Sequence, residues 1–487
     1  MMQKDNLKHK AASGMVWTAI QKYSKMLITF ISGIILARLL MPEDYGAIGM
    51  LFIFMGLAEV FIDAGFGSAL IQKKNPTQTD YSTVFYFNIV MSVILYAVLY
   101  FSAPAIAEFY RMPILSKVLR VQGLILFIYA FNIIQRNQIR KNLKFKKLSK
   151  VTITTSVISL IVTVIMAYMG FGVWSLVAQH FIVALIPCIY FWLTMNWRPT
   201  WEYSWASFKE LFGFGFYMFL THLFTTFSQR ITGLLVGRWY DSATMGYYSK
   251  ASVLRKSATL SVAGVMIDTT YPLYASVQDD KARLINMVKR ITSTLAYLTV
   301  PMLSLLILTA KPLIILLYSD RWLPSVPYFQ ILCIGGMAGC LQAVNQQTIA
   351  AIGKSRVFFV WTVVKNSVGI VLQVVGLIVW GIWGLLAGKV LSNWFSYLVN
   401  ITMVSKYVGY KSYQQLMDLS PIFIVSAVAV IAGYFGSSLL GLGLYTDGLV
   451  KIMIFVAFYL GWSLLFKPEA YKYTMSVLDV LKSRKKK

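Results

Sequence analysis

The sequence predicts an all-α polytopic membrane protein of about 14 transmembrane helices, and three observations support this fold class. The 487 residues are 58% hydrophobic and 15% aromatic but only 13% charged, which is too little charge for a water-soluble surface. Apolar stretches of about 20 residues, the length of a membrane-spanning helix, recur from residue 14 to residue 466. Basic residues gather in alternate connections. These features exclude a soluble enzyme, a nucleic-acid-binding protein and a secreted disulfide scaffold.

The apolar stretches define the expected helices in chain order. In the first half they cover residues 14–40, 45–71, 81–102, 114–135, 149–169 and 172–193. In the second half they cover residues 211–239, 244–273, 291–310, 328–352, 357–379 and 382–404. Two further helices are expected at 419–440 and 449–466.

The distribution of basic residues predicts the orientation. With the N-terminus inside, the inner loops carry 29 of the 45 Lys and Arg residues, whereas the outer loops carry three, Arg111, Lys311 and Arg321. Because loops rich in Lys and Arg stay in the cytoplasm, we expect both termini there. The net charge of +27 therefore reflects topology and does not indicate a nucleic-acid partner.

Thirteen basic residues remain within the predicted spans, and several lie deep inside them. A charge at that depth costs at least about 3 kcal/mol on insertion scales, so it should face protein or water rather than lipid. The intramembrane acids are Glu59, Asp63 and Asp268. They either neutralise nearby lysines or couple transport to H⁺ or Na⁺. The deepest basic residues are Lys22, Lys25, Lys250, Arg255 and Lys256.

The chain contains an internal repeat. Residues 31–38 (ISGIILAR) match residues 231–238 (ITGLLVGR), and residues 172–178 match 381–387. We therefore expect a six-helix lobe over residues 1–200, a second over 201–410, and two extra helices with a basic cytoplasmic tail over 411–487. Two repeats of six helices enter from the same side, so a pseudo-twofold axis along the membrane normal should relate them, with a substrate site between them.

Polar stripes on four helices are candidate cavity walls. Amides donate and accept hydrogen bonds, as sugar hydroxyls require, although the same groups can simply join helices. Helices 14–40 and 211–239 contribute Gln21, Thr29, His222, Thr225 and Gln229. Helices 114–135 and 328–352, with the loop after the first, contribute Asn132, Gln135, Arg136, Gln342, Asn345 and Gln346.

Catalytic and metal-binding patterns are missing from the sequence. The three cysteines, Cys188, Cys333 and Cys340, all lie in apolar spans, and the three histidines lack metal-ligand spacing. No Walker, GxSxG, HExxH or paired CxxC motif occurs. We therefore expect no catalytic residues, no metal and no cofactor, and a protein that is not an enzyme.

Three segments carry a resemblance to a known family. Ala37-Arg-Leu-Leu-Met-Pro-Glu-Asp-Tyr-Gly46, Asp63-Ala-Gly-Phe-Gly67 and Ala69-Leu-Ile-Gln72 resemble the polysaccharide-transporter branch of the multidrug/oligosaccharidyl-lipid/polysaccharide exporter superfamily. The chain is most similar there to Wzx-type flippases and colanic acid exporters of bacterial envelopes. The likeness extends over essentially the whole chain.

The resemblance implies a function in the bacterial plasma (inner) membrane. Polyprenyl-pyrophosphate-linked oligosaccharide would be flipped from the cytoplasmic to the outer leaflet by alternating access between two lobes. The implied partners are this glycan lipid, membrane lipids and polysaccharide assembly proteins. Family members carry basic residues in the central cavity, whereas helix 45–71 here offers only Glu59 and Asp63. The residues available to hold pyrophosphate are Lys22, Lys25, Arg230, Lys250, Arg255 and Lys256.

Two alternatives stay open from the sequence. A multidrug exporter of the same superfamily moves cations, so its cavity should be acidic or aromatic, and the deep basic residues argue against it. An envelope polysaccharide polymerase or ligase is an enzyme that needs a sizeable outer loop. The longest one here, residues 311–327, has 17 residues.

Overall fold

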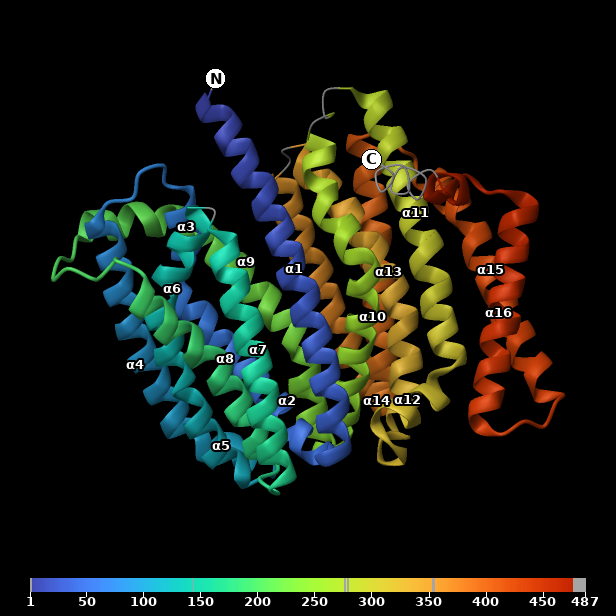
Figure 1. Ribbon diagram of the computed structural model, residues 1–487, viewed down its shortest axis with the longest axis horizontal. Helices are drawn as coiled ribbons and strands as arrows, with labels where there is room; N and C mark the ends of the chain where they lie inside the picture. Colours follow the sequence, from blue (N-terminus) through green and yellow to red (C-terminus); the bar gives the residue numbers. More distant parts are fainter. Residues whose placement is uncertain (1, 143, 276, 278–279, 353–354, 476–487) are drawn as a thin grey trace. The chain divides into compact units, whose positions relative to one another are not determined.

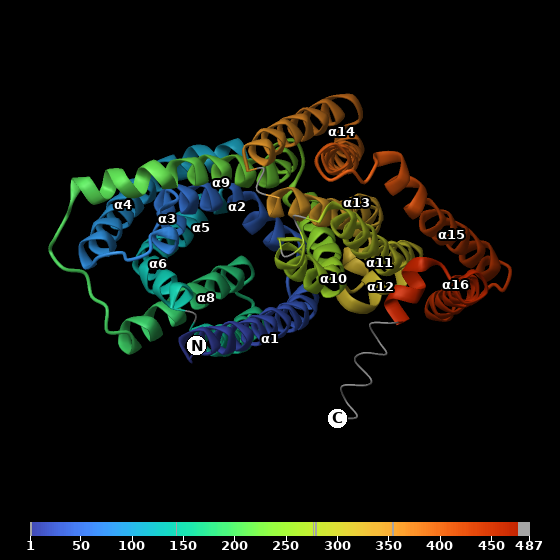
Figure 2. The same cartoon turned by 90° about the horizontal axis from the view of Figure 1, so that it is seen from above.

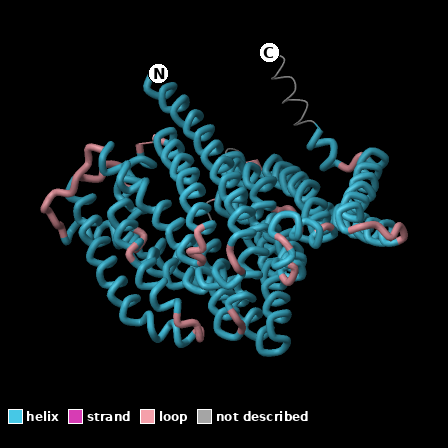
Figure 3. The backbone as a smooth tube through the Cα atoms, turned by 60° about the horizontal axis from the view of Figure 1, so that its bottom comes forward, coloured by secondary structure: helices cyan, strands magenta, loops and turns pink. Residues whose placement is uncertain are grey.

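The protein folds into α-helices joined by short connections. The computed structural model describes residues 2–142, 144–275, 277, 280–352 and 355–475, and these residues contain no β-strand (Figure 3). The first helices are α1 (Met2–Leu39), α2 (Pro42–Asp63), α3 (Phe66–Gln72), α4 (Gln78–Phe109), α5 (Ile114–Gly123), α6 (Ile125–Lys141), α7 (Phe145–Tyr168), α8 (Val173–Thr194) and α9 (Trp205–Trp239). They are followed by α10 (Ser242–Ala275), α11 (Lys281–Leu308), α12 (Ala310–Tyr318), the short 3₁₀ turn η1 (Asp320–Trp322), α13 (Ser325–Ala351), α14 (Ser355–Tyr407), α15 (Ser412–Ser438) and α16 (Leu444–Phe466) (Figure 1).

The predicted fold class is confirmed. Among the described residues, 11 helical segments are long and apolar enough to cross a membrane. One of them, in α14, holds two predicted spans, because Trp380 and Gly381 leave helical geometry between them. The helices α1 and α10 carry internal charges such as Lys25 and Lys250, and they complete the predicted set of fourteen.

The described chain divides into two compact units, residues 1–249 and 250–487. In the first unit, α9 packs on α2 and α3 (Figure 2). The six-helix lobes expected over residues 1–200 and 201–410 stay a prediction. The connection before α9 is also tied to α4, since the Ser204 amide donates to Thr83 Oγ1 at 3.0 Å and the Thr200 amide donates to Ser82 Oγ at 3.0 Å. Within this unit, α1 packs on α7 and α7 packs on α8.

The first unit contains a reciprocal glycine contact. A Cβ atom on Gly46 would lie 1.8 Å from the carbonyl oxygen of Ser242, and one on Gly246 would lie 2.0 Å from that of Pro42. Gly46 and Gly246 are 200 positions apart, as are Pro42 and Ser242, and 200 is also the offset between segments 31–38 and 231–238. The starts of α2 and α10 therefore cross at equivalent positions, and only glycine allows this approach.

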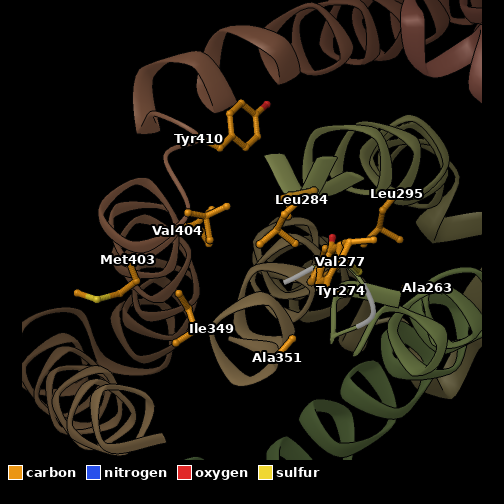
Figure 4. Packing of buried hydrophobic residues seen from close by; sticks show 14 residues of the cluster. Ala263, Tyr274, Val277, Leu284, Leu295, Ile349, Ala351, Met403, Val404 and Tyr410 are labelled. Carbon is orange, nitrogen blue, oxygen red and sulfur yellow. The ribbon is translucent and has the colours of Figure 1, made fainter. Parts of the chain in front are cut away.

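The second unit has its own apolar core, formed where α11, α13 and α14 pack together (Figure 4). Leu284 and Leu295 of α11, Ile349 of α13 and Val404 of α14 are all buried there. Tyr410, in the connection from α14 to α15, closes one side of this core. The helices α15 and α16 pack on each other and on α11.

Candidate functional site

Two adjoining cavities of about 470 and 350 Å³ lie inside the first unit. Both are lined by Glu59 of α2, Tyr129 and Arg136 of α6, and Arg230 of α9. The larger cavity extends to Arg140, one residue before the end of α6. The predicted topology puts the end of α6 on the cytoplasmic side, so we expect this cavity to open to that side.

Four basic side chains line the two cavities, against two carboxylates. The basic residues are Lys25, Arg136, Arg140 and Arg230. An aromatic ring supports Arg230, since its Cζ lies 5.0 Å from the centre of the Phe52 ring. Such a cation–π contact fixes a guanidinium without neutralising it, so its charge stays available to a ligand.

The carboxylates Glu59 and Asp63 lie one helical turn apart on α2, which places them on the same side of the helix. Arg230 and Arg136 are the cations that act electrostatically on Glu59. Asp63 accepts a hydrogen bond from the Gly67 amide at 3.2 Å and interacts with His222 and Arg140. In the described part of the chain, no basic nitrogen lies within 4 Å of either carboxylate. The acidic and basic groups of the cavity are therefore not joined in ion pairs.

The glycines of the Asp63–Gly67 segment shape the part of the cavity around Asp63, where α2 turns into α3. Gly65 has φ +79°, and a Cβ there would lie 2.1 Å from the carbonyl oxygen of Gly215 in α9. At Gly67 a Cβ would lie 2.7 Å from Asp63 Oδ1. The segment thus turns the chain from α2 into α3, brings α9 close and leaves room for the carboxylate.

The rim next to the cavity is held by ion pairs. Lys73 Nζ, just after α3, lies 3.0 Å from Asp80 and 2.9 Å from Glu210. Burial alone would lower the pKa of Lys73, but the hydrogen bonds with Glu210 and Asp80 outweigh it and raise that pKa. Lys141 Nζ donates to the carbonyl of Leu70 at 2.9 Å. These contacts attach α3 to α4, α6 and α9.

The structure brings together two of the six residues expected to bind pyrophosphate. Lys25 and Arg230 line the cavities, whereas Lys22 is half-buried on α1 and is not a lining residue. In the second unit, Lys250 is 4% exposed and lies 5.1 Å from the ring centre of Tyr318. Arg255 packs against Gly336, and Lys256 is exposed. The phosphate-binding role of all six residues stays a prediction.

The polar stripes also separate into two groups. Cavity-lining members are His222, Gln229, Asn132 and Arg136. Others join helices: Gln21 Nε2 donates to Thr152 Oγ1 at 3.1 Å, and Gln415 Nε2 donates to Asn345 Oδ1 at 3.0 Å. Gln135 is fully buried beside Phe131 and Trp192, where its amide can donate to the Phe131 carbonyl. Away from the two cavities lie Thr29, which is exposed, and Thr225, Gln342 and Gln346, which are half-buried.

Several lining residues were not expected from the sequence. Arg140 had been counted with the cytoplasmic loop, and His180 and Gln122 showed no motif. In the structure, Gln122 Nε2 lies 3.1 Å from His180 Nδ1, and the His180 ring centre lies 5.8 Å from that of Phe52. The only sequence signal was that all three residues are polar within or beside an apolar stretch. Of the candidate coupling residues, Glu59 and Asp63 line the cavity, and the Asp268 side chain lies outside the described residues.

The family model described as "Polysaccharide biosynthesis protein" matches residues 35–327. The teichuronic acid biosynthesis protein TuaB of Bacillus subtilis (strain 168) is 25% identical over 351 residues, which are 72% of this chain and 73% of that protein. The lipopolysaccharide biosynthesis protein WzxC of Escherichia coli (strain K12) is 19% identical over 432 residues, 88% of each chain.

Two kinds of solved structure share the fold. The lipid II flippase MurJ in an inward closed conformation has a TM-score of 0.74 at 16% identity and covers 93% of this chain and 98% of its own. An inward-facing multidrug transporter of the MATE family has a TM-score of 0.62 at 14% identity and covers 81% and 98%.

Proposed function

Because this chain belongs to the polysaccharide biosynthesis protein family, we propose that it is a flippase for polyprenyl-pyrophosphate-linked oligosaccharide. It moves the repeat unit from the cytoplasmic to the outer leaflet of a bacterial inner membrane and performs no covalent chemistry. Support comes from relatives named for teichuronic acid and lipopolysaccharide biosynthesis, and from one named as a succinoglycan biosynthesis transport protein. The structural neighbours include a flippase for another lipid-linked molecule, lipid II.

The observation that carries the proposal is the basic excess of a cavity within membrane-spanning helices. Lys25, Arg136, Arg140 and Arg230 face it, against Glu59 and Asp63. A pyrophosphate diester carries about two negative charges, and guanidinium groups bind phosphate oxygens through two parallel hydrogen bonds. A cationic substrate would be repelled by this excess of positive charge.

Each part of the substrate has a matching environment. Arg136 and Arg230 line both cavities where these adjoin, and in this proposal they hold the pyrophosphate. Asn132, His222 and Gln229 present donors and acceptors suited to sugar hydroxyls. The polyprenyl chain remains in the bilayer, where it loses no hydrophobic contact.

Glu59 gives the site a means of release. When ionised, it competes with phosphate for Arg136 and Arg230, the two cations that act on it. When it is protonated or holds Na⁺, both arginines are free for the ligand. The proposal therefore includes coupling of transport to H⁺ or Na⁺ through Glu59 or Asp63. It also includes alternating access between the lobes, with both termini in the cytoplasm.

The test uses protein in liposomes that contain a fluorescent polyprenyl-pyrophosphate oligosaccharide, with a quencher reporting its leaflet. Wild-type protein should flip the lipid, and Arg136→Gln with Arg230→Gln should reduce the rate at least tenfold. Lys451→Gln, in α16 and outside the cavity, should be close to wild type. Parallel vesicles carry a cationic dye. Dye transport without lipid flipping would contradict the proposal and favour the multidrug exporter.

A further inference from the structure

A third cavity, of about 360 Å³, lies at the opposite end of α9 from the rim at Lys73 and Glu210. The turn after α4 and the end of α9 with the connection to α10 form it, together with Met50 of α2. All of its lining residues belong to the first unit. Both segments are on the predicted outer side of the membrane. The lining includes Tyr110, Arg111, Arg238, Trp239, Asp241 and Ser242.

Arg238 is held in place by the end of α4. Its Nη1 donates to the Phe109 carbonyl at 2.9 Å, and its Cζ lies 4.8 Å from the centre of the Phe109 ring. A guanidinium has five N–H donors, so most of them stay available on a group whose orientation is already fixed. The alternative for an arginine at a membrane surface is to extend into water, and Arg238 packs on protein instead.

Arg111 approaches the same cavity from the turn after α4. Its φ of +53° is uncommon for a non-glycine residue. Its side chain is exposed and makes no hydrogen bond or ion pair with any residue that the structure describes. The lining carboxylate, Asp241, is already engaged, because its Oδ1 accepts a hydrogen bond from the Thr244 amide at 2.9 Å. The cavity therefore has two guanidinium groups against one carboxylate.

Basic residues are scarce on the predicted outer side of the membrane. Two arginines at one cavity there are therefore informative. The predicted outer loops hold three basic residues, and one of them, Arg111, lines the same cavity as Arg238, which is more than 120 residues away in the sequence. Tyr110 and Trp239 also line the cavity, and Trp239 is 61% exposed. Tyr and Trp concentrate at the level of lipid headgroups, so we expect the cavity at the depth of a lipid phosphate.

From this arrangement we infer that the third cavity is a phosphate-binding site, which receives the pyrophosphate head of the substrate after it has crossed. This inference rests on the proposed function. Ser242 connects this site with the contact between α2 and α10. It lines the cavity, and its carbonyl oxygen faces Gly46 across that contact. A ligand bound there lies beside the contact that must open for outward release.

The test measures inorganic pyrophosphate binding to the full chain in phosphatidylcholine nanodiscs, where both membrane faces are accessible. Calorimetry should find two sites on wild-type protein. Arg111→Gln with Arg238→Gln should weaken one of them about tenfold or more, while Arg136→Gln with Arg230→Gln should weaken the other. Arg111→Gln alone should weaken the same outer site without affecting folding, since this side chain has no described partner. Lys311→Gln, another predicted outer basic residue, should match wild type.

Two results would overturn the inference. One is unchanged stoichiometry and affinity in both Arg111 variants. The other is displacement of pyrophosphate from the outer site by phosphatidylglycerol in the nanodisc, which would assign the site to a phospholipid headgroup. Failure of wild-type protein to flip lipid in liposomes would reject the proposed function separately, because pyrophosphate binding does not depend on transport.

Discussion

At the scale of single residues, the cavity shows how a charge can be held without being neutralised. The Phe52 ring lies near two polar groups: its centre is 5.0 Å from the guanidinium carbon of Arg230 and 5.8 Å from the centre of the His180 ring. Gln122 in turn lies 3.1 Å from His180 Nδ1. An acid at the position of Phe52 would bind Arg230 more tightly but would cancel the charge that a phosphate needs. Phe52 therefore orients the Arg230 side chain without neutralising the guanidinium charge.

Replacing the Phe52 ring tests this interpretation. Phe52→Leu keeps the volume roughly similar but removes the π face, and cation–π contacts contribute about 0.5 to 2 kcal/mol. We expect flipping to slow by roughly two- to thirtyfold, while Phe52→Tyr, which retains the ring, stays near wild type. The liposome assay measures both rates. Equal rates for Phe52→Leu and wild type would show that other contacts hold Arg230.

At the scale of elements, glycine determines which helices approach each other. Gly65 permits contact between α9 and the turn from α2 to α3, and Gly46 and Gly246 permit the crossing of α2 and α10. Elsewhere a glycine carries no such constraint: around a Cβ on Gly213 there is nothing within 4 Å. The close contact at Gly46 lies at the predicted outer ends of its helices, and we expect it to close the path from the cavities to that side.

A larger residue at position 46 should open this contact. A leucine side chain cannot fit where even a Cβ would lie 1.8 Å from the Ser242 oxygen, so Gly46→Leu should push the helix starts apart. We expect a cysteine at position 229 in the cavity to become reactive toward a membrane-impermeant maleimide added outside. The natural cysteines, all buried, are first replaced by alanine.

Gly213→Leu on α9 is the matched control and should leave position 229 protected. If Gly46→Leu also leaves it protected, although the variant is folded and active, the contact between α2 and α10 is not the outer closure.

At the scale of the whole molecule, the sequence predicted the helices better than the cavity. Apolar length identified the spans because a bilayer imposes one length on every helix. Helical spacing placed Gln21 and Lys25 on one face, but it could not say which neighbour each side chain meets. Gln21 bonds to Thr152, 131 residues away, whereas Lys25 faces the cavity. The division into units after residue 249 was equally hidden in the sequence, because the contacts that join α9 to the first unit are long-range.

The direction of transport should also be a property of the whole molecule. Moving one uncompensated negative charge outward through an inside-negative membrane releases about 2.3 kcal/mol per 100 mV, so a pyrophosphate head would be driven outward by the potential alone. We expect outward flipping in liposomes to accelerate when valinomycin and a K⁺ gradient make the interior negative, and to slow when the gradient is reversed. A rate independent of potential would mean that the charge crosses with compensating cations. In that case Glu59→Gln, which removes a carboxylate that a proton or Na⁺ would occupy, should abolish dependence on the pH or Na⁺ gradient.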